Sequence, residues 1–154
     1  MAGPRNNHRG ASIPGDRDLI DVTIPSDFAA SRDLQRQVQS HLLQRHYSEE
    51  SFFAIKLALE EALLNAIKHG NRQDNSKQVH VRITITPRQT EIIIEDQGPG
   101  FDRSTVPDPT LDENLEKCTG RGILLIESYM NKVQWSRGGR RLRMIRKNDH
   151  RTVA

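Results

Sequence analysis

The chain has 154 residues, 34% of them hydrophobic, and a formal net charge of +3, which fits one domain with one buried core. Its single cysteine, Cys118, excludes an intrachain disulfide and a metal site built from several cysteines. No stretch approaches the ~18 consecutive apolar residues of a membrane span, and no apolar segment near the start predicts a signal peptide. We therefore expect a cytoplasmic protein with a folded domain over residues 19–147, between flexible tails at residues 1–18 and 148–154.

The first part of this domain is predicted to form one strand followed by two helices. Residues 19–24 alternate apolar and polar side chains and end at a proline, which predicts a short strand. Ser26 or Asp27 caps a helix over about residues 27–45, in which apolar residues recur at near-helical spacing. A second helix, with a serine as its N-cap, covers residues 48–70 and is apolar on most sides. We therefore expect the second helix to be largely buried.

Two polar side chains interrupt the second predicted helix. Glu61 and Asn65 are four residues apart and share one face, and a buried carboxylate is costly unless something compensates for it. One interpretation is that this face lines a cleft, where the Asn65 carbonyl oxygen binds Mg²⁺ and Glu61 orients or deprotonates a hydroxyl group. The other is that Glu61 lies on the surface and Asn65 makes a local hydrogen bond. Glu60 lies about 100° away around the helix, so only one of the two glutamates can face a site with Asn65.

The middle of the chain is predicted to form a hairpin, a loop and a third helix. Residues 79–86 alternate apolar and polar side chains, as a half-buried strand does. Residues 91–95 follow after a turn and include three consecutive isoleucines, which favours a more central strand. Residues 101–119 contain acids and prolines with little periodicity and are expected to form a mobile loop. Residues 122–130 are expected to form an apolar helix.

The last predicted element is a hairpin of residues 133–135 and 142–146 around a Gly-Gly pair. It lies in a basic segment, residues 137–151, whose net charge of +6 leaves −3 for the rest of the chain. This segment is interpreted as the solvated outer face of an edge hairpin or as a docking surface for an acidic partner. Direct nucleic-acid binding is disfavoured, because no aromatic residue is interleaved among the basic ones for stacking.

Together these elements predict an α/β (α+β) two-layer sandwich. Its sheet would be mixed but mostly antiparallel, with about five strands, and the three helices would cover one face.

A carboxylate and two glycines follow directly after the predicted central strand. Asp96 ends the strand, and Gly98 and Gly100 lie in the turn after it. A carboxylate accepts hydrogen bonds but cannot donate them, which suits the exocyclic amino group of adenine and disfavours a carbonyl at the same place. The glycines would let the backbone approach a base or turn sharply. The alternative is a tight turn with a favourable composition and no ligand.

A second glycine pair comes just before the third predicted helix. Gly120, Arg121 and Gly122 precede Ile123 and a run of apolar residues. Bare backbone N–H groups at the positive end of a helix bind phosphate well. The alternative is a loop-to-helix junction that needs glycine only for its geometry.

These three pieces, in this order, resemble the N, G1 and G2 boxes of the GHKL (Bergerat-fold) ATPases, a superfamily that includes gyrase, mismatch-repair ATPases and histidine kinases. The match rests on residues 61–65, 96–100 and 120–122. Residues 19–147 as a whole resemble the compact branch formed by the anti-sigma-factor serine/threonine kinases. The sequences of that branch are very similar to residues 64–71 and 108–115 of this chain. The resemblance implies an α/β sandwich that binds ATP with Mg²⁺ under a mobile lid at about Phe101–Thr119.

The roles of the family's residues carry over to the matching positions. Glu61 would be the catalytic base, Asn65 the Mg²⁺ ligand and Asp96 the residue that reads adenine. His69 lies one turn beyond Asn65 and would reach the nucleotide, unless it only interacts with the dipole at the helix end. The residues that would flank the base or hold the phosphates are Gly98, Gly100, Gly120, Arg121, Gly122 and Ile123.

The resemblance also implies two protein partners. The kinase would transfer phosphate from ATP to a serine or threonine of an anti-sigma-factor antagonist of the STAS type, and it would sequester a sigma factor. A homodimer is consistent with the same family. A histidine kinase's catalytic domain is disfavoured, because the segment His41–Arg45 lacks the acid that follows a phosphoacceptor histidine.

Two departures from the family pattern leave an alternative open. Cys118 and Thr119 stand where well-studied members carry an arginine that contacts the γ-phosphate. Arg140 and Arg141 follow the last hairpin's glycine, where members often have a threonine that binds adenine. The alternative function is therefore a catalytically weak or inactive ATP-binding module that acts only by sequestering a partner.

Overall fold

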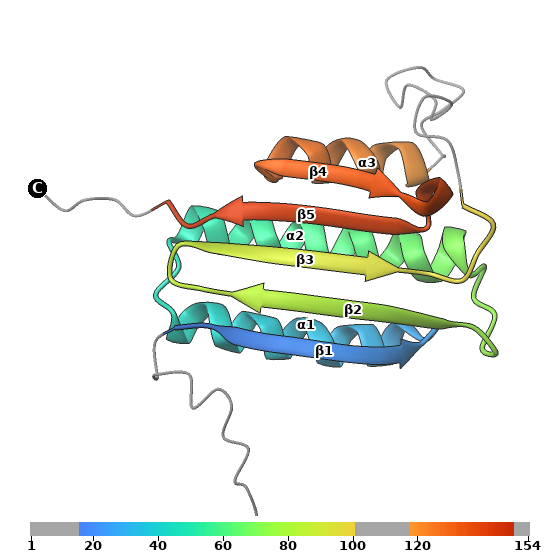
Figure 1. Ribbon diagram of the computed structural model, residues 1–154, viewed down its shortest axis with the longest axis horizontal. Coiled ribbons are helices and arrows are strands. Elements are labelled where there is room, and N and C mark those ends of the chain that lie inside the picture. Colours follow the sequence, from blue (N-terminus) through green and yellow to red (C-terminus); the bar gives the residue numbers. More distant parts are fainter. Residues whose placement is uncertain (1–15, 101–117, 150–154) are drawn as a thin grey trace, which may run out of the picture.

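The protein folds as two layers, a five-stranded sheet and a layer of helices (Figure 1). This computed structural model describes residues 16–100 and 118–149. The strand order is β1-β2-β3-β5-β4. The strands are β1 (Asp18–Pro25), β2 (Gln78–Ile85), β3 (Gln89–Glu95), β4 (Lys132–Ser136) and β5 (Arg141–Lys147).

The helices lie together on one face of the sheet, behind it in Figure 1. The core forms between the two layers, where strands β2 and β3 place alternate side chains against the helices. Among the described residues, no helix has the length and apolar character needed to cross a membrane. The helices are α1 (Phe28–Gln44), α2 (Glu49–Leu64) and α3 (Cys118–Tyr129), with a π-helical turn η1 (Asn65–Gly70) after α2 and a 3₁₀ turn η4 (Arg137–Gly139) after β4.

The predicted two-layer sandwich is confirmed, and β3 is central, as its three isoleucines suggested. The sheet is antiparallel at all four described strand pairs, without the parallel pair of a mixed sheet. Strands β3 and β4 run in the same direction, but β5 lies between them (Figure 1). After α3 the chain forms β4 at the edge of the sheet, and the following hairpin places β5 between β4 and β3.

The predicted helix starts are confirmed in the first two helices. Asp27 caps α1 by accepting a hydrogen bond of 2.8 Å from the N–H of Ala29, and Ser48 caps α2 through the N–H of Ser51. The expectation that the second helix is largely buried holds for most of its apolar residues but is wrong for Phe53. This ring is 52% exposed and packs edge-on against Tyr129 of α3, with centroids 5.8 Å apart.

The predicted boundaries need correction at two places. The third helix begins at Cys118, four residues before its predicted start, so Gly120 and Gly122 lie inside α3. The predicted C-terminal tail begins too early, because Asn148 is buried and its side chain hydrogen-bonds Ser48 and Pro87. Most of the predicted loop and lid, at residues 101–117, and most of both predicted tails lie outside the described residues.

The basic segment lies on the β4–β5 hairpin at one edge of the sheet. Arg137 forms an ion pair of 2.6 Å with Glu95, and Arg143 one of 2.7 Å with Glu91. Both glutamates belong to β3, so these arginines bind their own sheet. This arrangement favours the interpretation of a solvated outer face.

Candidate functional site

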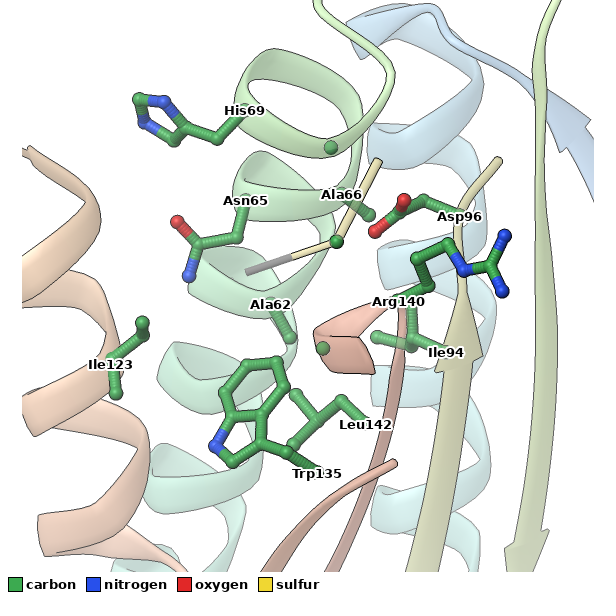
Figure 2. A pocket seen from close by; sticks show the side chains of 13 residues that line it. Ala62, Asn65, Ala66, His69, Ile94, Asp96, Ile123, Trp135, Arg140 and Leu142 are labelled. Atoms are coloured by element: carbon green, nitrogen blue, oxygen red, sulfur yellow. The ribbon is translucent and has the colours of Figure 1, made fainter. Parts of the chain in front are cut away.

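One pocket opens between the helical layer and the end of the sheet where β3 finishes (Figure 2). Its floor is a row of apolar side chains across three neighbouring strands. Ile94 on β3 lies opposite Leu142 on β5, and Leu142 lies opposite Trp135 on β4. The space over this floor measures about 550 Å³ when the open solvent in front of it is included. An apolar floor of this kind suits a flat ring system.

One face of α2 and η1 forms the facing wall of the pocket. Ala62, Asn65, Ala66 and His69 line it, and their i, i+3, i+4, i+7 spacing is that of one helical face. In Figure 2, Ala62 and Ala66 point toward the sheet that carries Ile94, whereas Asn65 and His69 point to the other side. The small side chains of Ala62 and Ala66 leave space for a ligand. Of the two polar residues, Asn65 lies between the alanines in sequence and His69 follows them.

The helix changes its winding where it meets the pocket. Helix α2 ends at Leu64, and the π-helical turn Asn65–Gly70 is closed by the N–H of Asn71, which donates to the Ala66 carbonyl at 2.8 Å. Such turns are rare and occur frequently at functional sites. The predicted end of the helix near Gly70 is confirmed, whereas periodicity did not predict the π turn.

Asp96 lines the pocket close to two glycines, Gly70 and Gly98. A Cβ on Gly70 would collide with the Asp96 carboxyl group, and a Cβ on Gly98 would collide with the Gly70 carbonyl. The N–H of Gly98 donates to Asp96 Oδ1 at 2.8 Å. Burial raises the pKa of Asp96, and the Gly98 hydrogen bond and the charge of Arg140 oppose that rise. The site therefore holds a partly desolvated acceptor that a ligand's donor would stabilise in its ionised form.

The turn after β3 meets the β4–β5 hairpin at the mouth of the pocket. Gly100 has a φ of +82°, and a Cβ there would collide with the Gly138 carbonyl, so glycine is required on both counts. The N–H of Asp96 donates to the Arg140 carbonyl at 3.0 Å. Arg140, one of the two residues that depart from the family pattern, lines the pocket beside Asp96 (Figure 2).

Glu61 and Asn65 share one helix face, as their spacing predicted, and this face is turned toward the start of α3. A Cβ on Gly122 would lie 2.8 Å from Glu61 Oε2 and 3.4 Å from Asn65 Nδ2. Glu60 is exposed, so Glu61 is the glutamate that shares this face. Burial raises the pKa of Glu61, and the nearby Glu60 charge adds to the rise. Among the described residues, Asn65 Nδ2 is buried without a hydrogen-bond partner.

The remaining predicted residues lie at the pocket or on the first turns of α3. His69 and Ile123 line the pocket. His69 is exposed, and its partial desolvation together with the charge of Lys68 lowers its pKa. Gly120 and Arg121 fall within the first four residues of α3, whose N–H groups have no acceptor inside the helix. Arg121 is exposed and is not one of the residues that line this pocket.

These residues fit a purine nucleotide and its metal ion. The apolar floor suits a base, the Asp96 carboxylate suits an amino group, and the buried amide of Asn65 lies on the side of the pocket toward α3 (Figure 2). Among the described residues, no group of three histidines, cysteines or acids could hold a metal by itself. Mg²⁺ would therefore use the Asn65 oxygen together with phosphate oxygens and waters, which is its usual preference.

Sequence reasoning missed several residues of the pocket. Two signals in the chain could have found some of them. Ala62 and Ala66 share the helical stripe of Asn65 and His69, and Ile94 precedes Asp96 by the two-residue period of a strand. No local signal identifies the residues that the hairpin contributes, because pairing across β3, β5 and β4 places them there. The missed residues are Ala62, Ala66, Gly70, Ile94, Trp135, Gly139, Arg140 and Leu142.

Comparison with known proteins agrees with this geometry. The model of a family described as the histidine kinase-like ATPase domain matches residues 24–146. The serine-protein kinase RsbW of Staphylococcus aureus is 33% identical over 123 residues, covering 75% of this chain and 77% of that protein. RsbW of Bacillus velezensis is 26% identical over 125 residues, covering 76% and 77%. The anti-sigma F factor of Shouchella clausii is 30% identical over 100 residues, covering 63% and 68%.

A solved structure is similar in fold. The structure of the RsbU and RsbW domains of a Mycobacterium tuberculosis protein superposes with a TM-score of 0.58 at 14% identity. The match covers 85% of this chain but only 32% of that one. The likeness therefore concerns the fold of one part of a longer protein.

Proposed function

The chain belongs to the histidine kinase-like ATPase family, in the branch of the anti-sigma-factor serine kinases, and we propose that it is an ATP-dependent protein kinase. Its substrate would be a serine or threonine hydroxyl on a protein partner. The observation that carries this proposal is the pocket itself, with Asp96 at one end of an apolar floor and Glu61 with Asn65 facing the start of α3.

The base of the nucleotide would occupy the part of the pocket above Ile94 and Leu142. Asp96 would accept a hydrogen bond from the exocyclic amino group of adenine, which a guanine carbonyl at the same position could not donate. Gly70, Gly98 and Gly100 leave room for the carboxylate and for the turns that enclose it. The proposal therefore requires ionised Asp96.

The phosphates would lie toward Asn65 and the first turn of α3. Mg²⁺, bound through the Asn65 oxygen, would neutralise phosphate charge. Free N–H groups of Gly120 and Arg121 would add positive potential at the helix start. In the transfer step the acceptor oxygen bonds to the γ-phosphorus as the bond to the leaving ADP oxygen breaks, and Glu61 takes the hydroxyl proton. A raised pKa suits Glu61 to this role as a base near neutral pH.

The partners follow from the relatives. Several similar proteins are named serine-protein kinase RsbW, and one is named anti-sigma F factor. We infer by analogy that this chain phosphorylates a STAS-type antagonist protein and regulates transcription by sequestering a sigma factor. A homodimer is part of the same proposal.

One observation favours a second candidate function. Arg121 is exposed and does not line the pocket, and Cys118 and Thr119 replace the arginine that precedes the glycine pair in related kinases. If Arg121, the basic residue described nearest the glycine pair, stays away from the γ-phosphate, the chain would bind ATP but transfer phosphate slowly. It would then act as an ATP-binding module that sequesters its partner.

The experiment measures binding and transfer separately. Trp135 is the only tryptophan of the chain and lines the pocket, so its fluorescence reports nucleotide binding. We expect saturable binding of ATP with Mg²⁺, and transfer of the labelled γ-phosphate to a serine of a candidate antagonist. Glu61→Ala should abolish transfer while retaining binding, and Glu60→Ala, which removes a neighbouring exposed carboxylate, is the matched control.

Each outcome decides between the two candidates. Transfer that depends on Glu61 but not on Glu60 supports the kinase. Binding without transfer supports the sequestering module. If magnesium and ATP leave both the fluorescence and the calorimetric signal unchanged, the nucleotide site itself is refuted.

A further inference from the structure

Asn71 is a fully buried polar residue beside the pocket but outside its lining. It follows directly after η1, and its relative exposure is 0%. A buried amide of this kind is costly unless its hydrogen-bonding groups are satisfied. Here the side chain forms hydrogen bonds with three separate parts of the chain, so its hydrogen-bonding groups are satisfied.

The amide nitrogen of Asn71 binds the segment just before α1 and the first residue of β2. Nδ2 donates to Ser26 Oγ and to the Gln78 carbonyl, both at 2.9 Å. Ser26 Oγ in turn donates to the Lys77 carbonyl at 2.8 Å. Both N–H donors of the side chain are therefore used, and the plane of the amide is fixed.

The amide oxygen of Asn71 binds the segment that carries Asp96. The backbone N–H of Gln97 donates to Asn71 Oδ1 at 2.7 Å. The side chain of Gln97 also accepts a hydrogen bond of 2.8 Å from the N–H of Gln78. Residue 97 is thus held on both sides, and both connections lead to the start of β2.

The hydrogen bond between Gln97 and Asn71 lies next to the contact between Asp96 and Gly70 at the pocket. Asp96 precedes Gln97, and its carboxyl group lies against Gly70, which precedes Asn71. The Asn71 backbone also closes the π turn through the Ala66 carbonyl at 2.8 Å. A single residue therefore fixes the end of the helix and the turn after β3 relative to each other.

We propose that Asn71 is a positioning residue for recognition of the base. It fixes the turn that carries Asp96 against the π turn, so that the carboxylate is directed at the amino group of a 6-aminopurine before ligand binds. The inference rests on the proposed ATP binding and extends it, because it assigns base selectivity to a residue that does not line the pocket. Loss of Asn71 should affect discrimination between bases more than retention of the triphosphate.

The test compares ATP with inosine triphosphate, in which a carbonyl replaces the amino group. Dissociation constants would be measured with Mg²⁺ through Trp135 fluorescence for the wild type, Asn71→Ala and Asn148→Ala. Asn148 is the matched control, since it is also a buried asparagine, with side-chain hydrogen bonds to Ser48 and Pro87 at the other end of the sheet. Thermal unfolding would show that each variant is folded at the temperature of the titration.

The wild type should prefer ATP by at least about 100-fold, because a carbonyl facing the carboxylate leaves the acceptor unpaired. Asn71→Ala should lower that ratio at least tenfold, mainly through weaker ATP binding. Asn148→Ala should keep the wild-type ratio even if its melting temperature falls as far. An unchanged ratio in folded Asn71→Ala would show that Asn71 only supports the fold.

A measurement on the wild type keeps the inference testable if Asn71→Ala does not fold. Without nucleotide, the Gln97 amide proton should exchange at least 100-fold more slowly than an exposed amide, because Asn71 Oδ1 accepts it. Fast exchange at Gln97 would refute prior positioning of the turn. Failure of the wild type to bind ATP would refute the proposed function as well, whereas a wild type that binds ATP and inosine triphosphate equally would refute only base reading and the role of Asn71.

Discussion

Replacing Gly122 by alanine should separate the stability of this protein from its phosphotransfer activity. An added Cβ would lie 2.8 Å from Glu61 Oε2, 3.4 Å from Asn65 Nδ2 and 3.7 Å from Asn65 Oδ1. The contact with Asn65 is nearly tolerable, but the contact with Glu61 is too short. Because ordinary contacts between nonbonded atoms begin near 3.5 Å, the carboxylate would have to withdraw by about 0.7 Å.

The folding cost of this withdrawal should be small. Glu61 Oε2 is the end of a flexible side chain, so a rotation relieves the clash without moving the backbone. Alanine also has a helix propensity about 1 kcal/mol better than glycine, and Gly122 lies within α3. We therefore expect Gly122→Ala to be as stable as the wild type or up to about 1 kcal/mol more stable in urea unfolding.

The catalytic cost should be large, because the proposed base leaves its position. A displacement of about 1 Å can reduce the rate of a positioned reaction by about 100-fold. We expect transfer of labelled phosphate to fall by roughly that factor, while ATP binding, measured through Trp135, changes less than tenfold. Ser128→Ala, at an exposed position of the same helix, controls for the gain in helix propensity and should keep full activity.

Two results would contradict this reasoning. Wild-type transfer by Gly122→Ala would show that Glu61 is not the base or is not constrained by α3. A loss of several kcal/mol in stability would show that the space beside Gly122 cannot accommodate a methyl group. In either case the packing of α3 on Glu61 and Asn65 would need a different interpretation.

Three further predictions follow from the same site. Burial raises the pKa of Asp96, so its charge destabilises the folded protein at pH values above that pKa. Asp96→Asn should therefore raise the melting temperature of the free protein at pH 7, by an amount that shrinks as the pH falls through the pKa, and should weaken ATP binding at least tenfold. A lower melting temperature would contradict the proposed burial penalty. Burial and the charge of Glu60 raise the pKa of Glu61. Phosphate transfer should therefore decline as the pH falls through a pKa above that of an ordinary glutamate, and Glu60→Ala should move this decline to lower pH. If Glu60→Ala leaves the dependence of the transfer rate on pH unchanged, Glu61 is not the titrating base. Gly98→Ala should lower the free energy of unfolding by about 1–3 kcal/mol, because the new methyl group meets the backbone carbonyl of Gly70, and unchanged denaturation in urea would show that this turn can yield.

The sequence predicted well wherever the signal is local. The period of two in the strands and the near-helical period in the first two helices identified the sandwich, and the caps at Asp27 and Ser48 lie where propensity places them. The four-residue spacing of Glu61 and Asn65 is also local, and it correctly placed both side chains on one helix face, whereas only the packing of the helices turned that face toward α3. The position of Asp96 directly after the central strand was also a local signal, and the structure places it at the pocket, while its role in binding adenine stays a prediction.

The sequence misled where neighbours in space decide the outcome. Phe53 looks like a core residue by composition, yet it lies on the outer side of α2 against Tyr129. Helix α3 begins four residues before its predicted start, because its first residues include two glycines and no run of apolar residues that periodicity could detect. Asn148 looks like the start of a polar tail, but its side chain is buried between two other segments.

Spacing along the chain therefore predicted the architecture and two carboxylates, an amide and two pairs of glycines as the residues of a nucleotide site. Only the tertiary structure decided how they meet. The order β3-β5-β4 brings Trp135 and Leu142 beside Ile94 to form the pocket floor, and the π turn ending at Asn71 brings Gly70 against Asp96. The reason is physical: propensity and periodicity act over a few residues, whereas strand order, close glycine contacts and buried hydrogen bonds join segments that are far apart in the chain.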